Sequence, residues 1–186
     1  MWKGTTQTGR IEVICGSMFS GKSEELLRRL KRARIAKKKY QLFKPAVDDR
    51  YSKTEVVSHS GVRMDCQVLK NLYQIVDYLE EDTEIIAFDE AQFFDPILLE
   101  VATSLANLGK RVIVAGLDMD SSGKPFGPMP ALLAVAEEVL KLTAVCEKCG
   151  EPATHTYRKT NEEKEQVLVG AGEHYQARCR DHWCAR

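Results

Sequence analysis

The chain has 186 residues, of which 44% are hydrophobic and 29% are charged, and 27 basic residues balance 27 acidic ones. This composition is ordinary for a globular protein of one domain, with or without a small appendage, and the balanced charge favours neither nucleic acid nor a membrane surface as partner. No apolar run approaches the roughly 20 residues of a membrane span. The opening "MWKGTTQTGR" lacks the apolar core of a signal peptide. We therefore expect a cytoplasmic protein with reduced cysteines.

Short apolar runs alternate with helical patterns as far as Val145. The expected strands cover residues 11–15, 40–46, 84–90, 111–118 and 139–145, and the expected helices begin near residues 21 and 69 and cover 97–108 and 131–138. Segment 48–63 is expected to be a loop or hairpin, and segment 121–130 a Gly/Pro-rich loop. This alternation predicts an α/β fold in which a parallel sheet is flanked by helices.

Two of the expected helices are defined by their apolar stripes. One stripe consists of Leu69, Leu72, Tyr73, Val76 and Leu79, and the other of Ile97, Val101, Leu105 and Leu108. Pro96 suits the start of the second helix and Gly109 its end.

A basic run from Arg28 to Lys39 reads "RRLKRARIAKKK" and contains eight basic residues and no acid. Such runs usually form a solvated helix face. The alternative is a cationic collar near bound phosphates.

The stretch "GSMFSGKS" matches the P-loop pattern in full, with an expected strand before it and an expected helix after it. Its two glycines let the backbone curl, so that successive N–H groups point at one anion. Lys22 is expected to reach the β- and γ-phosphates, and the Ser23 hydroxyl to ligate Mg²⁺. The predicted phosphate-binding residues are Gly16, Ser17, Met18, Phe19, Ser20, Gly21, Lys22 and Ser23.

Two carboxylates close the expected strand "EIIAFDE". Asp89 fits the acid that holds Mg²⁺ beside the P-loop. Glu90 is then free to accept a proton from whatever attacks the γ-phosphate. That attacking group is water in an ATPase and a substrate hydroxyl in a small-molecule kinase, and the two acids do not distinguish these cases.

The composition changes after Val145, because the remaining 41 residues hold four of the six cysteines and three of the four histidines. Cys146-x-x-Cys149 and Cys179-x-x-His182, separated by 29 residues, supply four ligands for a closed, structural Zn²⁺ site. His182 is favoured as the fourth ligand because its spacing mirrors the first pair, with Cys184 as the alternative. We expect a nucleotide-binding domain over 1–145 and a zinc-binding lobe over 146–186.

These motifs together resemble the thymidine kinases of the cellular, tetrameric, zinc-containing type. The resemblance runs through "GSMFSGKS", "KPAVDDRYS", "DEAQFF", "GKPFGPMP", "CEKC", "VGAGEHY" and "CRDH", in the order of the family and over nearly the whole chain. The pair "DEAQFF" and "GKPFG" is far more specific than a P-loop alone. The matching fourth zinc ligand is often Cys in the family, whereas here it is His182.

The resemblance implies roles for particular residues. Glu90 resembles the base that takes the proton of the thymidine 5′-hydroxyl, and Asp89 the acid beside Mg²⁺. The implied ATP and phosphate side comprises the P-loop with Asp48, Asp49, Arg50, Asp89, Glu90, Ala91 and Gln92. The implied nucleoside side comprises Met18, Phe93, Thr156, Tyr175 and a lasso-like lid loop of Gln166, Val167, Leu168, Val169 and Gly170. Ser121 joins this side at a position where some members of the family carry an aromatic residue.

The resemblance also implies ATP with Mg²⁺ as donor, structural Zn²⁺, a homotetramer and feedback inhibition by dTTP. Thymidine should be the preferred acceptor and deoxyuridine a weaker one, because one methyl group near Thr156 would discriminate them. A different hypothesis is a P-loop ATPase or GTPase whose zinc ribbon binds nucleic acid or protein, with the basic run contacting phosphates. A nucleotide sensor without turnover is a third.

Overall fold

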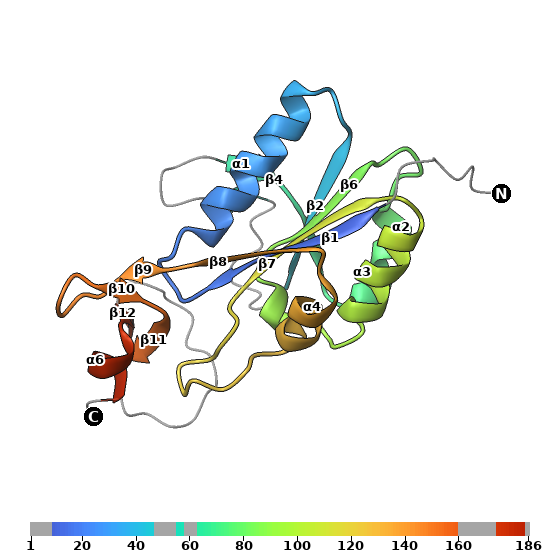
Figure 1. The fold of residues 1–186 in the computed structure, drawn as a ribbon. Coiled ribbons are helices and arrows are strands. Elements are labelled where there is room, and N and C mark those ends of the chain that lie inside the picture. The colour runs from blue at the N-terminus through green and yellow to red at the C-terminus, as the bar shows by residue number, and fades with distance from the viewer. Residues whose placement is uncertain (1–8, 47–54, 58–62, 160–173, 185–186) are drawn as a thin grey trace.

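The computed structural model describes residues 9–46, 55–57, 63–159 and 174–184 of the chain. Six strands form one parallel sheet in the order β5-β2-β6-β7-β1-β8 (Figure 1). They are β1 (Arg10–Gly16), β2 (Tyr40–Pro45), β5 (Gln67–Leu69), β6 (Ile85–Phe88), β7 (Arg111–Gly116) and β8 (Glu138–Leu142). Each neighbouring pair in this sheet is parallel, which confirms the expected α/β sheet.

Helices cover both faces of the sheet (Figure 1). They are α1 (Lys22–Ile35), η2 (Leu72–Gln74), α2 (Ile75–Tyr78), η3 (Ala91–Phe93), α3 (Leu98–Asn107) and α4 (Met129–Val135). Side chains of β1 alternate between the faces: Ile14 packs with Leu26 and Leu30 of α1, whereas Val13 packs with Leu98 of α3 in the other core. Both faces are therefore apolar, as buried parallel strands require.

Among the described residues, no helix is both long enough and apolar enough to cross a bilayer.

The helix expected from Leu69 to Leu79 is wrong in its first half. Leu69 closes β5, and the chain then turns at Asn71, whose side chain accepts a hydrogen bond from a backbone N–H of η2. Only a short helical segment remains after this turn. As a result Tyr73 and Val76 of the predicted stripe are 72% and 76% exposed.

The second stripe is confirmed in part. Leu105 is buried as predicted, and Ile97 and Val101 pack against the core at its edge. The other buried residues of α3 are Leu98 and Ala102, and Leu108 is exposed. Gly109 follows the helix with φ of +82°, which agrees with its expected place at the C-terminal end.

The helix expected over 131–138 begins and ends earlier, because Glu137 already belongs to the sheet edge. Its backbone N–H donates to the Ile11 carbonyl over 3.0 Å, and its carboxylate accepts the Ile11 N–H over 2.6 Å. The strand expected over 139–145 is divided into β8 and a shorter strand, β9 (Ala144–Val145).

Short antiparallel pairs complete the fold. In the segment expected to be a loop or hairpin, β3 (Glu55–Val57) pairs with β4 (Arg63–Asp65). Beyond β8, β9 pairs with β10 (Pro152–Ala153), β11 (His155–Arg158) pairs with β12 (Tyr175–Arg178), and α6 (Arg180–Cys184) follows. We call residues 144–159 and 174–184 the C-terminal lobe. Its buried apolar cluster consists of Ala144, Cys146, Ala153 and Ala177, which is too small to stabilise a fold without further support.

Part of the basic run holds α1 to the sheet. Glu12 in β1 is fully buried and pairs with Arg111 over 2.6 Å, Arg10 over 2.7 Å and Arg29 of α1 over 2.5 Å. Burial alone would raise the pKa of Glu12, but hydrogen bonds from these three arginines lower it to about 2. Arg29 therefore has a structural role, whereas Arg32 of the same run is exposed.

Glu12→Gln should destabilise the fold by about 3 kcal/mol, because it leaves buried guanidinium groups without their carboxylate. The folded pKa of about 2 lies below the unfolded value of about 4.3. The stabilisation by Glu12 is therefore complete above the unfolded pKa and is lost as the pH falls toward the folded one. Urea unfolding of the variant should accordingly depend less on pH over that acid range.

The matched control is Glu84→Gln, which removes the exposed pair with Lys38. It should cost less than about 1 kcal/mol. Equal losses in the two variants would contradict the assigned role of Glu12.

Candidate active site and metal centre

The P-loop follows the carboxyl end of β1, and steric contacts fix its path. Gly16 has φ of +140°, and a Cβ atom there would lie 2.2 Å from the Leu142 carbonyl oxygen of β8. No larger residue fits at this position. Gly21, with φ of +85°, precedes α1 in the left-handed conformation. The predicted strand, loop and helix are thus all present, and the N-terminus of α1, where unpaired amides favour anions, follows the loop directly.

Asp89 and Ser23 meet beside the P-loop. The Ser23 hydroxyl lies 3.1 Å and 3.3 Å from the two carboxylate oxygens of Asp89. Asp89 is only 5% exposed, and burial together with the neighbouring charge of Glu90 raises its pKa to about 7. A buried carboxylate beside a hydroxyl supplies the oxygen ligands that a hard cation such as Mg²⁺ takes.

Lys22 is held within the same loop. Its ammonium group donates to the Ser17 carbonyl over 2.7 Å, and burial lowers its pKa. A buried ammonium group is stabilised when an anion arrives next to it. The loop therefore combines a cation with curved backbone amides, which suits phosphate.

Glu90 is fixed at the end of β6 by a buried amide. Its backbone is left-handed, with φ of +52°, and its side chain is exposed. The Gln92 side chain donates to the Glu90 carboxylate over 2.6 Å and accepts the Leu117 N–H over 2.9 Å. A non-glycine residue in this conformation costs about 1–3 kcal/mol. Gln92, predicted on the phosphate side, thus contacts Glu90 directly, and Ala91 beside it is packed in the core.

The C-terminal lobe contacts the P-loop by packing and by hydrogen bonds. Phe19 of the loop packs against the apolar cluster of the lobe. The Met18 N–H donates to the Thr156 hydroxyl over 3.1 Å, and the Ser17 hydroxyl donates to the Ala153 carbonyl over 3.2 Å. Met18 and Thr156, which were predicted from opposite ends of the chain, are therefore neighbours. Tyr175 lies on β12, beside the strand that carries Thr156, and is buried.

Two further residues predicted on the nucleoside side have defined contacts. The Phe93 ring meets the Phe126 ring edge-on, with centroids 5.5 Å apart. The Ser121 carbonyl accepts a hydrogen bond from the Trp183 indole over 3.3 Å. The remaining predicted residues lie outside the described part of the chain, so their assignments stay predictions; they are Asp48, Asp49, Arg50, Gln166, Val167, Leu168, Val169 and Gly170.

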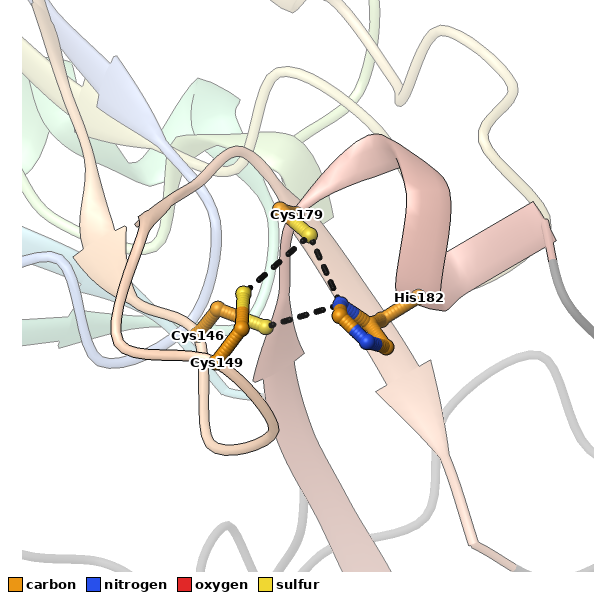
Figure 2. A group of neighbouring side chains, drawn as sticks. All are labelled: Cys146, Cys149, Cys179 and His182. Atoms are coloured by element: carbon orange, nitrogen blue, oxygen red, sulfur yellow. Dashed lines mark hydrogen bonds between the residues drawn. The ribbon is translucent and has the colours of Figure 1, made fainter.

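The four predicted zinc ligands converge, although they come from two turns that are far apart in sequence. Figure 2 shows Cys146, Cys149, Cys179 and His182 pointing toward one another, and their ligand atoms all lie within 4.8 Å of each other. The Cys149 and Cys179 sulfurs are 3.8 Å apart, and the Cys146 sulfur is 3.9 Å from His182 Nδ1. Cys184 is not part of this group, so the choice of His182 is supported.

The chemistry of this cluster fits Zn²⁺. Bonds of about 2.3 Å in a tetrahedron place sulfur ligands about 3.8 Å apart, which matches the observed separation. Burial raises the pKa of the Cys146 thiol, but backbone hydrogen bonds from neighbouring residues outweigh it and lower that pKa to about 6. The pKa of Cys149 moves the other way: a backbone hydrogen bond lowers it, but burial and the neighbouring sulfurs of Cys146 and Cys179 outweigh that bond and raise the pKa to about 11. A bound cation would favour the thiolate at both positions. The other two cysteines, Cys15 and Cys66, are buried packing residues, as expected.

Sequence reasoning missed residues that the fold brings to the site. Asp118 follows β7 as Asp89 follows β6, and it is 6% exposed. One of its oxygens lies 2.7 Å from the Lys141 ammonium group, and the other is buried without a hydrogen-bond partner among the described residues. The run "VIVAGLD", an apolar strand closed by an acid, carried the same signal as "IIAFDE". Phe126 lies in the motif "GKPFGPMP", but its contact with Phe93 had no signal in the sequence. Trp183 had none either, because its contacts come from distant segments.

A comparison with protein families gives a match over nearly the whole chain. The family model of thymidine kinase matches residues 9–183. The matched range contains the P-loop, both acids at the end of β6 and all four members of the Cys/His cluster.

Cys149→Ser and His182→Ala should each lose most of the bound zinc, because a closed tetrahedral site needs all four ligands. Cys184→Ser should keep about one zinc ion per chain. Metal content after desalting, measured by atomic emission, checks this. Loss of zinc in Cys184→Ser, with full retention in His182→Ala, would reverse the assignment of the fourth ligand.

Proposed function

This chain belongs to the thymidine kinase family, and on that premise we propose that it transfers the γ-phosphate of ATP to the 5′-hydroxyl of thymidine. Family membership carries the coarser statement that the protein is a kinase that phosphorylates thymidine, a reaction of nucleotide salvage. The finer proposal is supported most by the 3.1 Å hydrogen bond between the Met18 amide and the Thr156 hydroxyl. That contact joins the residues assigned to the acceptor directly to the loop assigned to the donor.

On the donor side, we assign the triphosphate of ATP to the P-loop, with Lys22 reaching the β- and γ-phosphates. Ser23 and Asp89 would hold Mg²⁺, since hydroxyl and carboxylate oxygens are the ligands that this ion prefers. When bound, Mg²⁺ neutralises charge on the transferring phosphoryl group. The raised pKa of Asp89, about 7, supports this assignment, because a neighbouring cation would favour the carboxylate.

On the acceptor side, we assign Glu90 as the general base. It accepts the proton of the 5′-hydroxyl as that oxygen bonds to the γ-phosphorus. The bond from the γ-phosphorus to the β,γ-bridging oxygen breaks, and ADP leaves. The 2.6 Å hydrogen bond from Gln92 supports this role, because it orients the carboxylate while leaving its other oxygen free of that contact. A positioned base contributes about 10²–10⁴-fold to the rate.

The nucleoside would lie between the P-loop and the C-terminal lobe. We assign Met18, Phe93, Ser121, Thr156, Tyr175 and the loop of residues 166–170 to this pocket. Backbone groups of such a loop can pair with the pyrimidine edge, and closing it would exclude water from the γ-phosphate. The thymine methyl near Thr156 would favour thymidine over deoxyuridine.

Assembly and regulation are proposed on the family premise alone. We infer a cytoplasmic homotetramer that is inhibited by dTTP, in which zinc stabilises the lobe that carries the lid. The proposed division into residues 1–145 and 146–186 agrees with these roles.

Glu90→Gln should lower kcat by about 10²–10⁴-fold, because the amide cannot accept the proton. Steady-state phosphorylation of labelled thymidine measures this, and KM for ATP should change little. Glu100→Gln, an exposed change on α3, is the matched control and should behave as the wild type. Full activity in Glu90→Gln would exclude Glu90 as the base.

A panel of nucleosides with ATP and Mg²⁺ should give thymidine the highest kcat/KM. Deoxyuridine should be weaker by about 10- to 200-fold, the range that a single methyl group provides. Deoxycytidine should be poorer still, because its exocyclic amine leaves the base-pairing groups of the loop unmatched. Phosphorylation of deoxycytidine as efficiently as thymidine would overturn the acceptor assignment.

A further inference from the structure

The segment between β7 and α4 forms a tight turn, which we call the 119–126 loop. Met119 and Pro125 form an isolated antiparallel bridge. Inside it, one carboxylate oxygen of Asp120 accepts the N–H groups of Ser122 over 2.8 Å and Lys124 over 3.0 Å. These contacts restrain the conformation of the loop tip from within the loop.

Trp183 of α6 holds this tip from outside. Its indole N–H donates to the Ser121 carbonyl over 3.3 Å. A Cβ atom on Gly123 would lie 2.6 Å from the indole ring, so the ring rests on the backbone of the loop. Trp183 also stacks on His155, with ring centroids 4.6 Å apart. The half-buried indole therefore contacts both the loop and β11.

The position of Trp183 depends in turn on the Cys/His cluster. It follows His182 directly, and its backbone N–H donates to the Cys179 carbonyl over 3.0 Å. Two members of the cluster therefore set where α6 begins and how it is oriented. The helix has only five residues and would not persist alone, so metal ligation would fix it in place.

The other end of the loop reaches the candidate active site. Phe126 meets Phe93 edge-on at 5.5 Å, and Phe93 ends η3, the turn that carries Gln92. A continuous series of contacts thus runs from the cluster through Trp183 and the loop to the pocket assigned to the nucleoside.

We propose that Trp183 is a positioning residue that couples metal occupancy of the Cys/His cluster to thymidine affinity by holding the 119–126 loop. The identity of the nucleoside rests on the proposed function, whereas the coupling between cluster and loop does not. Metal binding would order α6, seat the indole on Ser121 and Gly123, and so fix Phe126 against Phe93.

Tryptophan emission tests the coupling without substrate. The chain has two tryptophans, and Trp2→Phe leaves Trp183 as the only emitter. Removal of zinc by a chelator should shift its emission toward that of a water-exposed indole. In the zinc-loaded protein, Gly123→Ala should give a similar shift, because the new methyl group displaces the ring. Unchanged emission in both cases would overturn the coupling, whatever the enzyme phosphorylates.

Thermodynamic linkage tests the connection to the nucleoside. If zinc tightens thymidine binding by some factor, thymidine must tighten zinc binding by the same factor. Zinc affinity can be measured by competition with a chelating dye, with and without thymidine. In the full-length protein, thymidine should raise the zinc affinity by a factor of at least about five. Trp183→Ala should bring this factor close to one while zinc is retained. Trp183→Phe, which loses the N–H donor and part of the ring that lies against Gly123, should fall between.

Kinetics provide the second readout. Zinc-loaded Trp183→Ala should raise KM for thymidine about three- to tenfold, the range for one lost hydrogen bond, with kcat and KM for ATP nearly unchanged. Tyr73→Phe, an exposed aromatic change, is the control. Equal linkage in Trp183→Ala and wild type, or a fall in kcat alone, would overturn the proposal. A protein that phosphorylated no nucleoside would refute the proposed function, and the emission result would still decide the coupling.

Discussion

Parallel pairing of the six strands is the constraint on which the candidate site depends. Because parallel strands end at the same edge of a sheet, the turns after β1, β6 and β7 meet there and bring the P-loop, Asp89 and Asp118 together. β7 lies between the other two strands, so Gln92 can connect Glu90 to the backbone of Leu117, the residue that follows β7. The helices on both faces and the ion pairs of the buried Glu12 hold the strands of this sheet together.

The C-terminal lobe reaches the same edge by a different physical route. Its own apolar cluster is small, so metal ligation would take the place of a core. The lobe also rests on the P-loop through Met18 and Ser17. The segment that needs a metal is therefore the one that contacts the loop proposed to hold the donor. On the proposed function, a structural zinc ion and substrate recognition would in this way be physically connected.

Sequence motifs predicted those parts of the candidate site that depend on residues close together in the chain. The P-loop, the acids after β6 and the Cys/His cluster were all readable from spacing, because each motif needs fixed residue types at fixed intervals. The helix expected from Leu69 was wrong because its apolar spacing fits a strand end and a turn equally well. The contacts of Trp183 and the pairing of Glu12 could not be predicted, since they join segments that only the sheet order brings together.

The central claim is that the γ-phosphate passes to thymidine and not to water. The most direct measurement follows ADP and dTMP together in one reaction of ATP, Mg²⁺ and labelled thymidine. The account predicts a constant ratio of about one ADP per dTMP, with little ADP formed when thymidine is omitted. Sustained ADP release that does not depend on thymidine would contradict it and would favour an ATPase.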